Sequence, residues 1–150
     1  MKFFYLKVPL GAKSATLGSF LLKPIIPVRI SYKDKSAKYA ALIDSGADFC
    51  IFDAHIGDYL GIDVRSGEKE TFGGVQEAGL ATAYFHKVGV TIGDWEYKTD
   101  IGFSYDIAKY GYGILGQKGF FNLFKITFDY GAGEMELVSK NKSQSARIVL

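Results

Sequence analysis

Short apolar runs alternate with polar turns along the whole chain, and few stretches are long enough for a helix. The apolar runs occupy residues 3–8, 19–26, 28–32, 39–43, 50–52, 81–92, 95–103, 125–130 and 135–139. Glycine-containing turns separate several of them, and those at Gly93-Asp94 and at residues 130–133 each predict a β-hairpin. Since runs of this length between turn signals are typical of strands, the pattern predicts a mostly β protein.

Two short segments are predicted to be helical. Asp53–Leu60 begins with a good N-capping residue and ends before Gly61. Residues 117–124 form the second, although Gly119 inside it costs about 1 kcal/mol relative to alanine. A barrel or folded sheet with one or two short helices accommodates this pattern best.

Composition narrows the classes of function. The 150 residues are 48% apolar and 23% charged, which is ordinary for one globular domain. The net charge of +2 is too small to favour nucleic acid as a partner. One cysteine and two histidines exclude a disulfide framework within the chain and disfavour a zinc site. No apolar run reaches the roughly 20 residues of a membrane span, and no signal-peptide pattern is present, so we expect a cytoplasmic protein without a membrane segment.

The strongest chemical signal lies in residues 40–48, Ala-Ala-Leu-Ile-Asp-Ser-Gly-Ala-Asp. An apolar strand delivers Asp44 at its end, and Ser45 and Gly46 allow the backbone to turn tightly. Asp-Ser-Gly is also favourable chemistry for any turn. A solvent turn, however, does not need apolar residues on both sides, so the flanking runs place Asp44 at the edge of a core.

Two later segments carry glycines next to apolar residues. Residues 70–79 precede an alternating strand and predict a mobile hairpin, or flap, with Gly73-Gly74 near its tip, a plain hairpin being the alternative. In residues 112–116, Tyr-Gly-Ile-Leu-Gly, a glycine-flanked apolar pair leads into the second predicted helix. A core strand entering a helix is the alternative interpretation there.

Taken in this order, the three segments resemble the retroviral-type (retropepsin-like) aspartic protease family, over about residues 20–138. Residues 41–48 are similar to the family's apolar-apolar-Asp-(Thr/Ser)-Gly-Ala signature, residues 113–116 to its second hallmark, and residues 72–75 to its flap. The resemblance implies a single domain over residues 1–150. It implies a mostly β, retropepsin-like barrel with a flap hairpin, in which residues 139–150 form a tail.

The implied activity is that of an aspartic endopeptidase, which needs two catalytic carboxylates. The sequence has one Asp-Ser-Gly, and Asp129, the nearest second candidate, is assigned to a turn because Tyr130 cannot replace a small hydroxyl residue. We therefore expect a homodimer in which Asp44 of each subunit meets at a two-fold axis and Ser45 reaches toward the other chain. The strand Lys2–Val8 and the apolar tail at residues 148–150 are candidates for the dimer sheet.

The resemblance also assigns residues to the binding of an extended peptide substrate. It gives the active-site loop as Ser45 and Gly46 around the catalytic Asp44, and the substrate-binding residues as Ala47, Asp48, Ile51, Gly73, Gly74, Val75 and Ile114. It implies no metal and no organic cofactor. The partners expected are a second copy of the chain and a peptide or protein substrate, with neither nucleic acid nor membrane.

Position 117 departs from the family pattern. The family often has arginine after the second hallmark glycine, paired with an acidic residue at the position of Asp48; here the residue is Gln117. A hydrogen bond from a neutral amide is weaker than a charge-assisted pair, and Lys118 or Lys125 could compensate. The neighbouring Cys50 is expected to be a buried apolar residue without reactivity.

Two other functions stay open at this point. A domain of this fold can bind peptides or dimerise without efficient cleavage, because a fold does not guarantee an activity. An unrelated β-barrel that binds a small ligand is the third interpretation, and it requires all three motif resemblances to be accidental.

Overall fold

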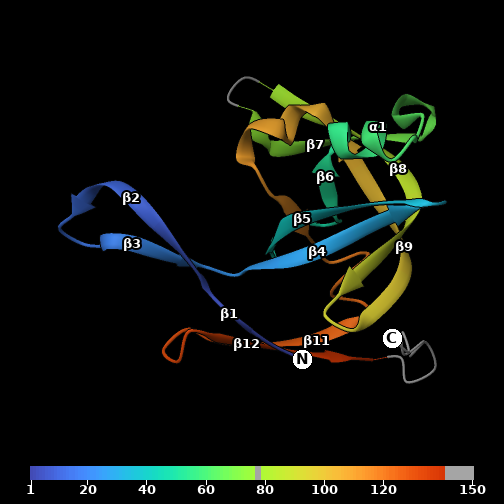
Figure 1. The fold of residues 1–150 in the computed structure, drawn as a ribbon. Helices are drawn as coiled ribbons and strands as arrows, with labels where there is room; N and C mark the ends of the chain where they lie inside the picture. Colours follow the sequence, from blue (N-terminus) through green and yellow to red (C-terminus); the bar gives the residue numbers. More distant parts are fainter. Residues whose placement is uncertain (77–78, 141–150) are drawn as a thin grey trace.

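Strands make up most of the protein, as the alternating pattern predicts (Figure 1). The computed structural model describes residues 1–76 and 79–140, with the backbone alone given at 74–76. The strands are β1 (Lys2–Phe4), β2 (Leu6–Ser14), β3 (Gly18–Lys23), β4 (Ile25–Tyr32), β5 (Lys35–Ile43), β6 (Ile51–Asp53), β7 (Glu68–Gln76), β8 (Gly79–Ile92), β9 (Trp95–Ser104), β10 (Gly113–Leu115), β11 (Phe124–Asp129) and β12 (Glu134–Ser139). The helical segments are α1 (Ala54–Tyr59) and two 3-10 helices, η1 (Val64–Ser66) and η2 (Tyr105–Tyr110).

The largest sheet folds back on itself. Its seven strands run in the order β4-β5-β10-β6-β9-β8-β7, and β4 also pairs with β8. That additional pairing joins the first strand of the order to the last but one, so six of the strands close into a barrel and β7 continues beyond it. The barrel expected from the sequence is therefore confirmed. Two smaller sheets complete the fold, β1-β12-β11 and the pair β2-β3.

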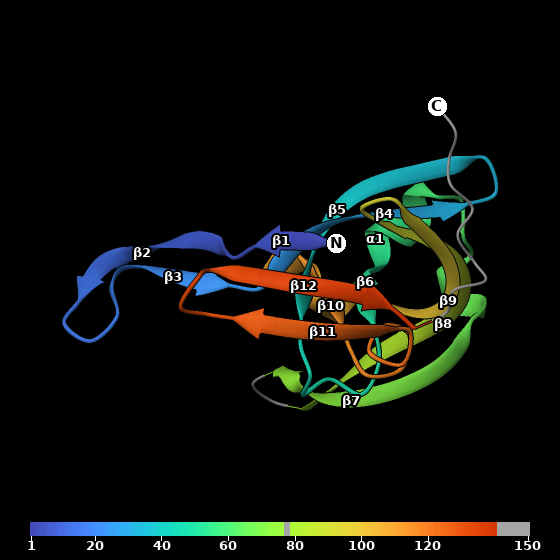
Figure 2. The same ribbon diagram turned by 90° about the horizontal axis from the view of Figure 1, so that it is seen from below.

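The core fills the barrel and continues under the three-stranded sheet. Phe52, Phe103 and Phe120 are its largest fully buried side chains, and Met135 and Leu137 of β12 are almost as deeply buried. The opposite face of β12 carries charges, and Lys2 on β1 forms an ion pair with Glu134 at 2.8 Å. This small sheet thus covers one end of the core with its apolar face (Figure 2).

The first helix is confirmed and the second is wrong. Asp53 caps α1 by accepting a hydrogen bond from the amide of His55 at 2.9 Å. Residues 117–123 form consecutive turns instead of a helix, because Gly119 has φ +102°, which a right-handed helix does not allow. Among the described residues, no helix is long and apolar enough to cross a membrane.

The predicted hairpins form, while the N-terminal strand is divided. Ile92 pairs with Trp95 across Gly93-Asp94, and Asp129 pairs with Glu134 across the turn at residues 130–133. The expected strand Lys2–Val8 is two strands: β1 pairs with β12 of the same chain, and β2 pairs with β3. The predicted tail at residues 148–150 lies outside the described residues.

Replacing Tyr97 by phenylalanine is expected to leave stability unchanged or to raise it by about 1 kcal/mol. The hydroxyl of Tyr97 is buried and has no hydrogen-bond partner in the described part of the chain. A buried polar group without a partner destabilises the fold, whereas the ring contact with Phe124, at 5.4 Å between centroids, is kept in the variant. Urea unfolding of both proteins measures the difference. A loss of more than about 1 kcal/mol contradicts this assignment of the hydroxyl.

Candidate active site

Two motifs that are far apart in the sequence lie side by side at the end of β5. Strand β10 runs parallel to β5, with Leu115 opposite Ile43. The amide of Asp44, the first residue after β5, donates a hydrogen bond to the carbonyl of Leu115 at 3.0 Å. The signature around Asp44 and the segment 113–116 are thus parts of one site.

Asp44 opens a tight turn and stabilises it with its own side chain. Its Oδ1 accepts a hydrogen bond from the amide of Gly46 at 2.9 Å, and its carbonyl accepts one from the amide of Ala47 at 3.2 Å. Any side chain at position 46 begins close to this carboxylate, since a Cβ there would lie 3.2 Å from Oδ1. Asp44 is half-buried and Ser45 is exposed, so the turn presents the carboxylate at the surface of the chain.

The backbone after β10 crosses directly over the loop that follows Asp44. The amide of Gln117 donates to the carbonyl of Ala47 at 2.8 Å, and the amide of Lys118 donates to that of Asp48 at 2.9 Å. At Gly116 the two backbones touch, because a Cβ there would lie 2.4 Å from the carbonyl oxygen of Phe49. This crossing fixes the position of the loop 44–48 relative to the barrel.

Gln117 binds the loop 44–48 at a different acceptor from the one that the sequence suggested. Its Nε2 donates to the backbone carbonyl of Ser45 at 2.7 Å instead of to the carboxylate of Asp48. Among the described residues, neither Lys118 nor Lys125 forms an ion pair with Asp48, so the compensation considered for those lysines is not seen. The neutral side-chain amide of Gln117 thus stands where the family pattern often has an arginine, and it binds the turn itself.

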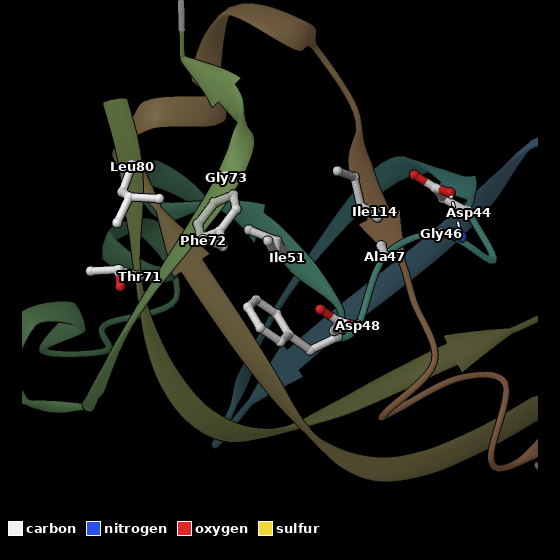
Figure 3. Close-up of a pocket in the computed structure, with 11 residues that line it drawn as sticks. Asp44, Gly46, Ala47, Asp48, Ile51, Thr71, Phe72, Gly73, Leu80 and Ile114 are labelled. Carbon is white, nitrogen blue, oxygen red and sulfur yellow. Dashed lines mark hydrogen bonds between the residues drawn. The ribbon is translucent and has the colours of Figure 1, made fainter. Parts of the chain in front are cut away.

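A pocket of about 560 Å³ separates this loop from the hairpin of β7 and β8 (Figure 3). Its lining residues are Asp44, Gly46, Ala47, Asp48, Phe49, Ile51, Thr71, Phe72, Gly73, Leu80 and Ile114. Figure 3 shows Asp44 on one side and the β7–β8 side chains on the other, with Ile51 and Ile114 between them. Ile51 and Ile114 also pair across β6 and β10, which makes the floor of the pocket part of the barrel.

Most of the residues predicted to bind substrate line this pocket, namely Ala47, Asp48, Ile51, Gly73 and Ile114. Ser45 is in the loop but not in the lining, and it faces solvent. Gly74 and Val75 belong to β7, and the structure describes only the backbone at these two positions. The last printed pair between the two strands is Gln76 with Gly79, so Gly73-Gly74 lie within β7, near its end.

Four lining residues were not assigned from the sequence: Phe49, Thr71, Phe72 and Leu80. The ring of Phe49 packs edge-on against Phe72 of β7 at 5.9 Å and against Phe85 of β8 at 5.0 Å. Phe49 therefore connects the loop after Asp44 to the hairpin opposite. The signal available was its place directly after the signature, but an aromatic residue there is equally compatible with the core.

Asp129 is a turn residue, as the sequence predicts. Its Oδ1 accepts a hydrogen bond from the amide of Ala132 at 2.9 Å within the β11–β12 turn. Nowhere in residues 1–76 and 79–140 do three His, Cys, Asp or Glu side chains gather in a way that could hold a metal ion. In the described part of the chain, the pocket thus offers Asp44 and Asp48 as its carboxylates.

Cys50 is expected to resist alkylation in the folded protein. Burial raises the pKa of its thiol from 9.0 to about 12, so the thiolate fraction at pH 8 falls about a thousandfold. Iodoacetamide labelling followed by mass spectrometry should give no adduct in the native protein and one adduct in guanidinium. The thiol of Cys50 ionises near pH 9 in the unfolded chain but not in the folded one. The free energy of unfolding is therefore retained below that pH and decreases above it. Rapid native labelling contradicts the burial.

The structure is similar to a solved structure described as a retropepsin-like aspartic protease from Rickettsia conorii. The TM-score is 0.56 and the sequence identity 15%, over 92% of this chain and 98% of the other. No protein-family model matches the sequence, and no curated protein matches it. At this identity the likeness shows the fold, which is the retropepsin-like fold expected from the motifs.

Proposed function

We propose that this chain is an aspartic endopeptidase that works as a homodimer, with Asp44 of each subunit as the catalytic pair. The observation that carries the proposal is the position of Asp44. It directly follows β5, the strand next to β10, and lines a pocket whose far side is the β7–β8 hairpin. A carboxylate at the rim of a pocket that has an apolar floor and lies opposite a hairpin suits hydrolysis of an extended chain.

The reaction requires two carboxylates that share one proton. One accepts a proton from the attacking water, while the other donates a proton to the carbonyl oxygen of the scissile bond. Two carboxylates about 3 Å apart do not both ionise, because their charges repel, and this keeps one of them protonated as the acid. Apparent pKa values then belong to the pair and not to either aspartate.

A second subunit supplies the missing carboxylate in this proposal. An isologous two-fold contact at the Asp44 turn brings the same residue from both chains to the axis. Ser45 is exposed beside that turn, and its hydroxyl has no hydrogen-bond partner among the described residues. It is therefore free to donate across the axis and to hold the two loops together.

The pocket suits a peptide with apolar side chains at the cleaved bond. Ala47 and Asp48 line the pocket beside the catalytic turn, where we expect them to contact the main chain of the substrate, and Ile51 and Ile114 supply the apolar floor. Gly73, Gly74 and Val75 of the flap strand close over the bound chain, which is recognised as an added strand.

Digestion of a mixed peptide library tests this function. We expect cleavage at about pH 4–7, the range set by a split carboxylate titration, at high protein concentration so that the dimer is populated. A transition-state mimic of peptide hydrolysis should bind far more tightly than the substrates, since only a working pair recognises it. Peptide binding without cleavage, by a folded dimer, indicates instead a silent peptide-binding domain.

A further inference from the structure

The hairpin of β2 and β3, residues 6–23 and here called the arm, extends away from the rest of the subunit (Figures 1 and 2). Its two strands form a sheet of their own, and in the described part of the chain neither joins another sheet. A two-stranded hairpin alone in water is marginally stable at best. Packing against another surface would therefore stabilise the arm.

Both faces of the arm carry apolar side chains, with Lys23 on one face and Lys7 on the other. Val8 lies opposite Leu21 on one face, and Pro9 lies opposite Phe20 on the other. A hairpin that lies on its own protein usually keeps one polar face toward solvent. Here Phe20 is 43% exposed and Leu17, near the tip, is 56% exposed. A partner that covers the arm would thus bury apolar surface that this subunit leaves in water.

The root of the arm lies beside the Asp44 turn. Pro24, between β3 and β4, accepts a hydrogen bond from the amide of Ile43 at 2.8 Å. The ammonium group of Lys23 lies 5.7 Å from the ring centre of Tyr112, just before β10. A second subunit that brings its own Asp44 to this turn must approach the same end of the barrel, so the arm lies along its path.

The charge of the arm fits a second copy of the chain. Residues 6–23 contain Lys7, Lys13 and Lys23 and no acidic residue, while all 16 acidic residues lie after residue 23. The arm therefore has a net charge of +3, while the remainder of the chain, with 15 basic and 16 acidic residues, has a net charge of −1. These opposite net charges favour association of the arm with a second copy.

We propose that the arm docks onto a second copy of this chain and holds the homodimer together. The proposal rests on the proposed function for the position of the two-fold axis. Each subunit contributes one arm and receives one, because a two-fold contact is reciprocal.

Sedimentation velocity over a range of concentrations tests the proposal on the full chain. We expect wild type to dimerise and Phe20→Glu to raise the dimer dissociation constant at least about tenfold, because it places a charge in the contact. Tyr59→Glu is the matched control, since Tyr59 is a 65% exposed aromatic residue on α1, and it should dimerise as wild type does. A wild type that stays monomeric, or a Phe20→Glu variant that dimerises equally well, overturns the proposal.

Hydrogen exchange on wild type tests the arm without any substitution. Amides of residues 6–23 should exchange more slowly at concentrations where the dimer forms, and dimerisation without this protection overturns the proposal. Flotation with phosphatidylcholine vesicles, with and without phosphatidylserine, tests the other surface that a basic apolar hairpin fits. Arm-dependent binding to the anionic vesicles by a monomeric protein overturns docking to a second copy.

The proposed function and the arm fail in distinguishable ways. If the dimer depends on the arm but Asp44→Asn cleaves as wild type does, the catalytic assignment is wrong and the arm proposal stands. If wild type cleaves through Asp44 but Phe20→Glu dimerises normally, the arm proposal is wrong and the function stands.

Discussion

Asp44→Asn is expected to lower peptide cleavage by about a thousandfold or more. An amide neither accepts a proton from water nor donates one to the scissile carbonyl, so a dimer of the variant loses both the acid and the base. The fold should be unaffected, because the Oδ1 of asparagine can accept the same hydrogen bond from the amide of Gly46. The loss should therefore appear in kcat, with unchanged unfolding in urea and an unchanged dimer.

Asp34→Asn is the matched control for this experiment. Asp34 is an exposed aspartate in the turn between β4 and β5, and removing its charge should leave cleavage as in wild type. Cleavage rates on a defined peptide, measured for all three proteins at the same concentration, test whether Asp44 is catalytic. Equal cleavage by wild type and Asp44→Asn contradicts the assignment and indicates a contaminating protease.

Gly116→Ala is expected to destabilise the protein by about 3–5 kcal/mol, a large part of the stability of a typical domain. The added Cβ would lie 2.4 Å from the carbonyl oxygen of Phe49 and 2.7 Å from that of Ala47, both backbone atoms that cannot rotate away. Relief requires the two crossing segments to separate. Because one of them is the loop after Asp44, cleavage should fall together with stability.

Gly131→Ala provides the comparison for Gly116→Ala. Its Cβ would have as its nearest neighbour the side-chain oxygen of Asp129, at 3.6 Å, which is ordinary contact. Urea unfolding should show a difference of less than about 0.5 kcal/mol for this variant. A Gly116→Ala protein as stable as Gly131→Ala shows that the crossing is not as tight as described.

The motif pattern predicts the centre of this fold well because local and tertiary requirements agree there. The apolar run before Asp44 forms β5, and the segment at residues 113–116 forms the strand beside it. Each of these segments must be apolar to be buried and needs small residues where backbones meet, as at Gly116. Local pattern and tertiary packing therefore require the same residue types in these segments, and the two motifs identify one site.

The prediction fails where a single residue changes a local pattern. Residues 117–124 have helical spacing, but Gly119 adopts a positive φ and its amide bonds the side chain of Asn122 instead of a helical carbonyl. The run Lys2–Val8 reads as one strand, yet the chain changes partners at Tyr5, whose amide bonds the carbonyl of Gly133. The strand with which each segment pairs depends on residues that are distant in sequence. The pattern within the segment therefore does not predict where its pairing changes.

Part of the site also lies beyond pattern analysis. Nothing in the spacing indicates that the side-chain Nε2 of Gln117 donates to the carbonyl of Ser45, because a long side chain can reach several acceptors from one backbone position. The contribution of Phe49 to the pocket is hidden in the same way, since an aromatic residue after a buried strand suits a core equally well.

Mixing of subunits tests the shared active site most directly. Wild type and Asp44→Asn, mixed in equal amounts and allowed to exchange at a concentration far above the dimer dissociation constant, form hetero- and homodimers at random. If each active site needs Asp44 from both chains, cleavage falls to about one quarter of that of wild type at the same total concentration. A fall to about one half means that each subunit acts alone, and it contradicts the two-fold active site.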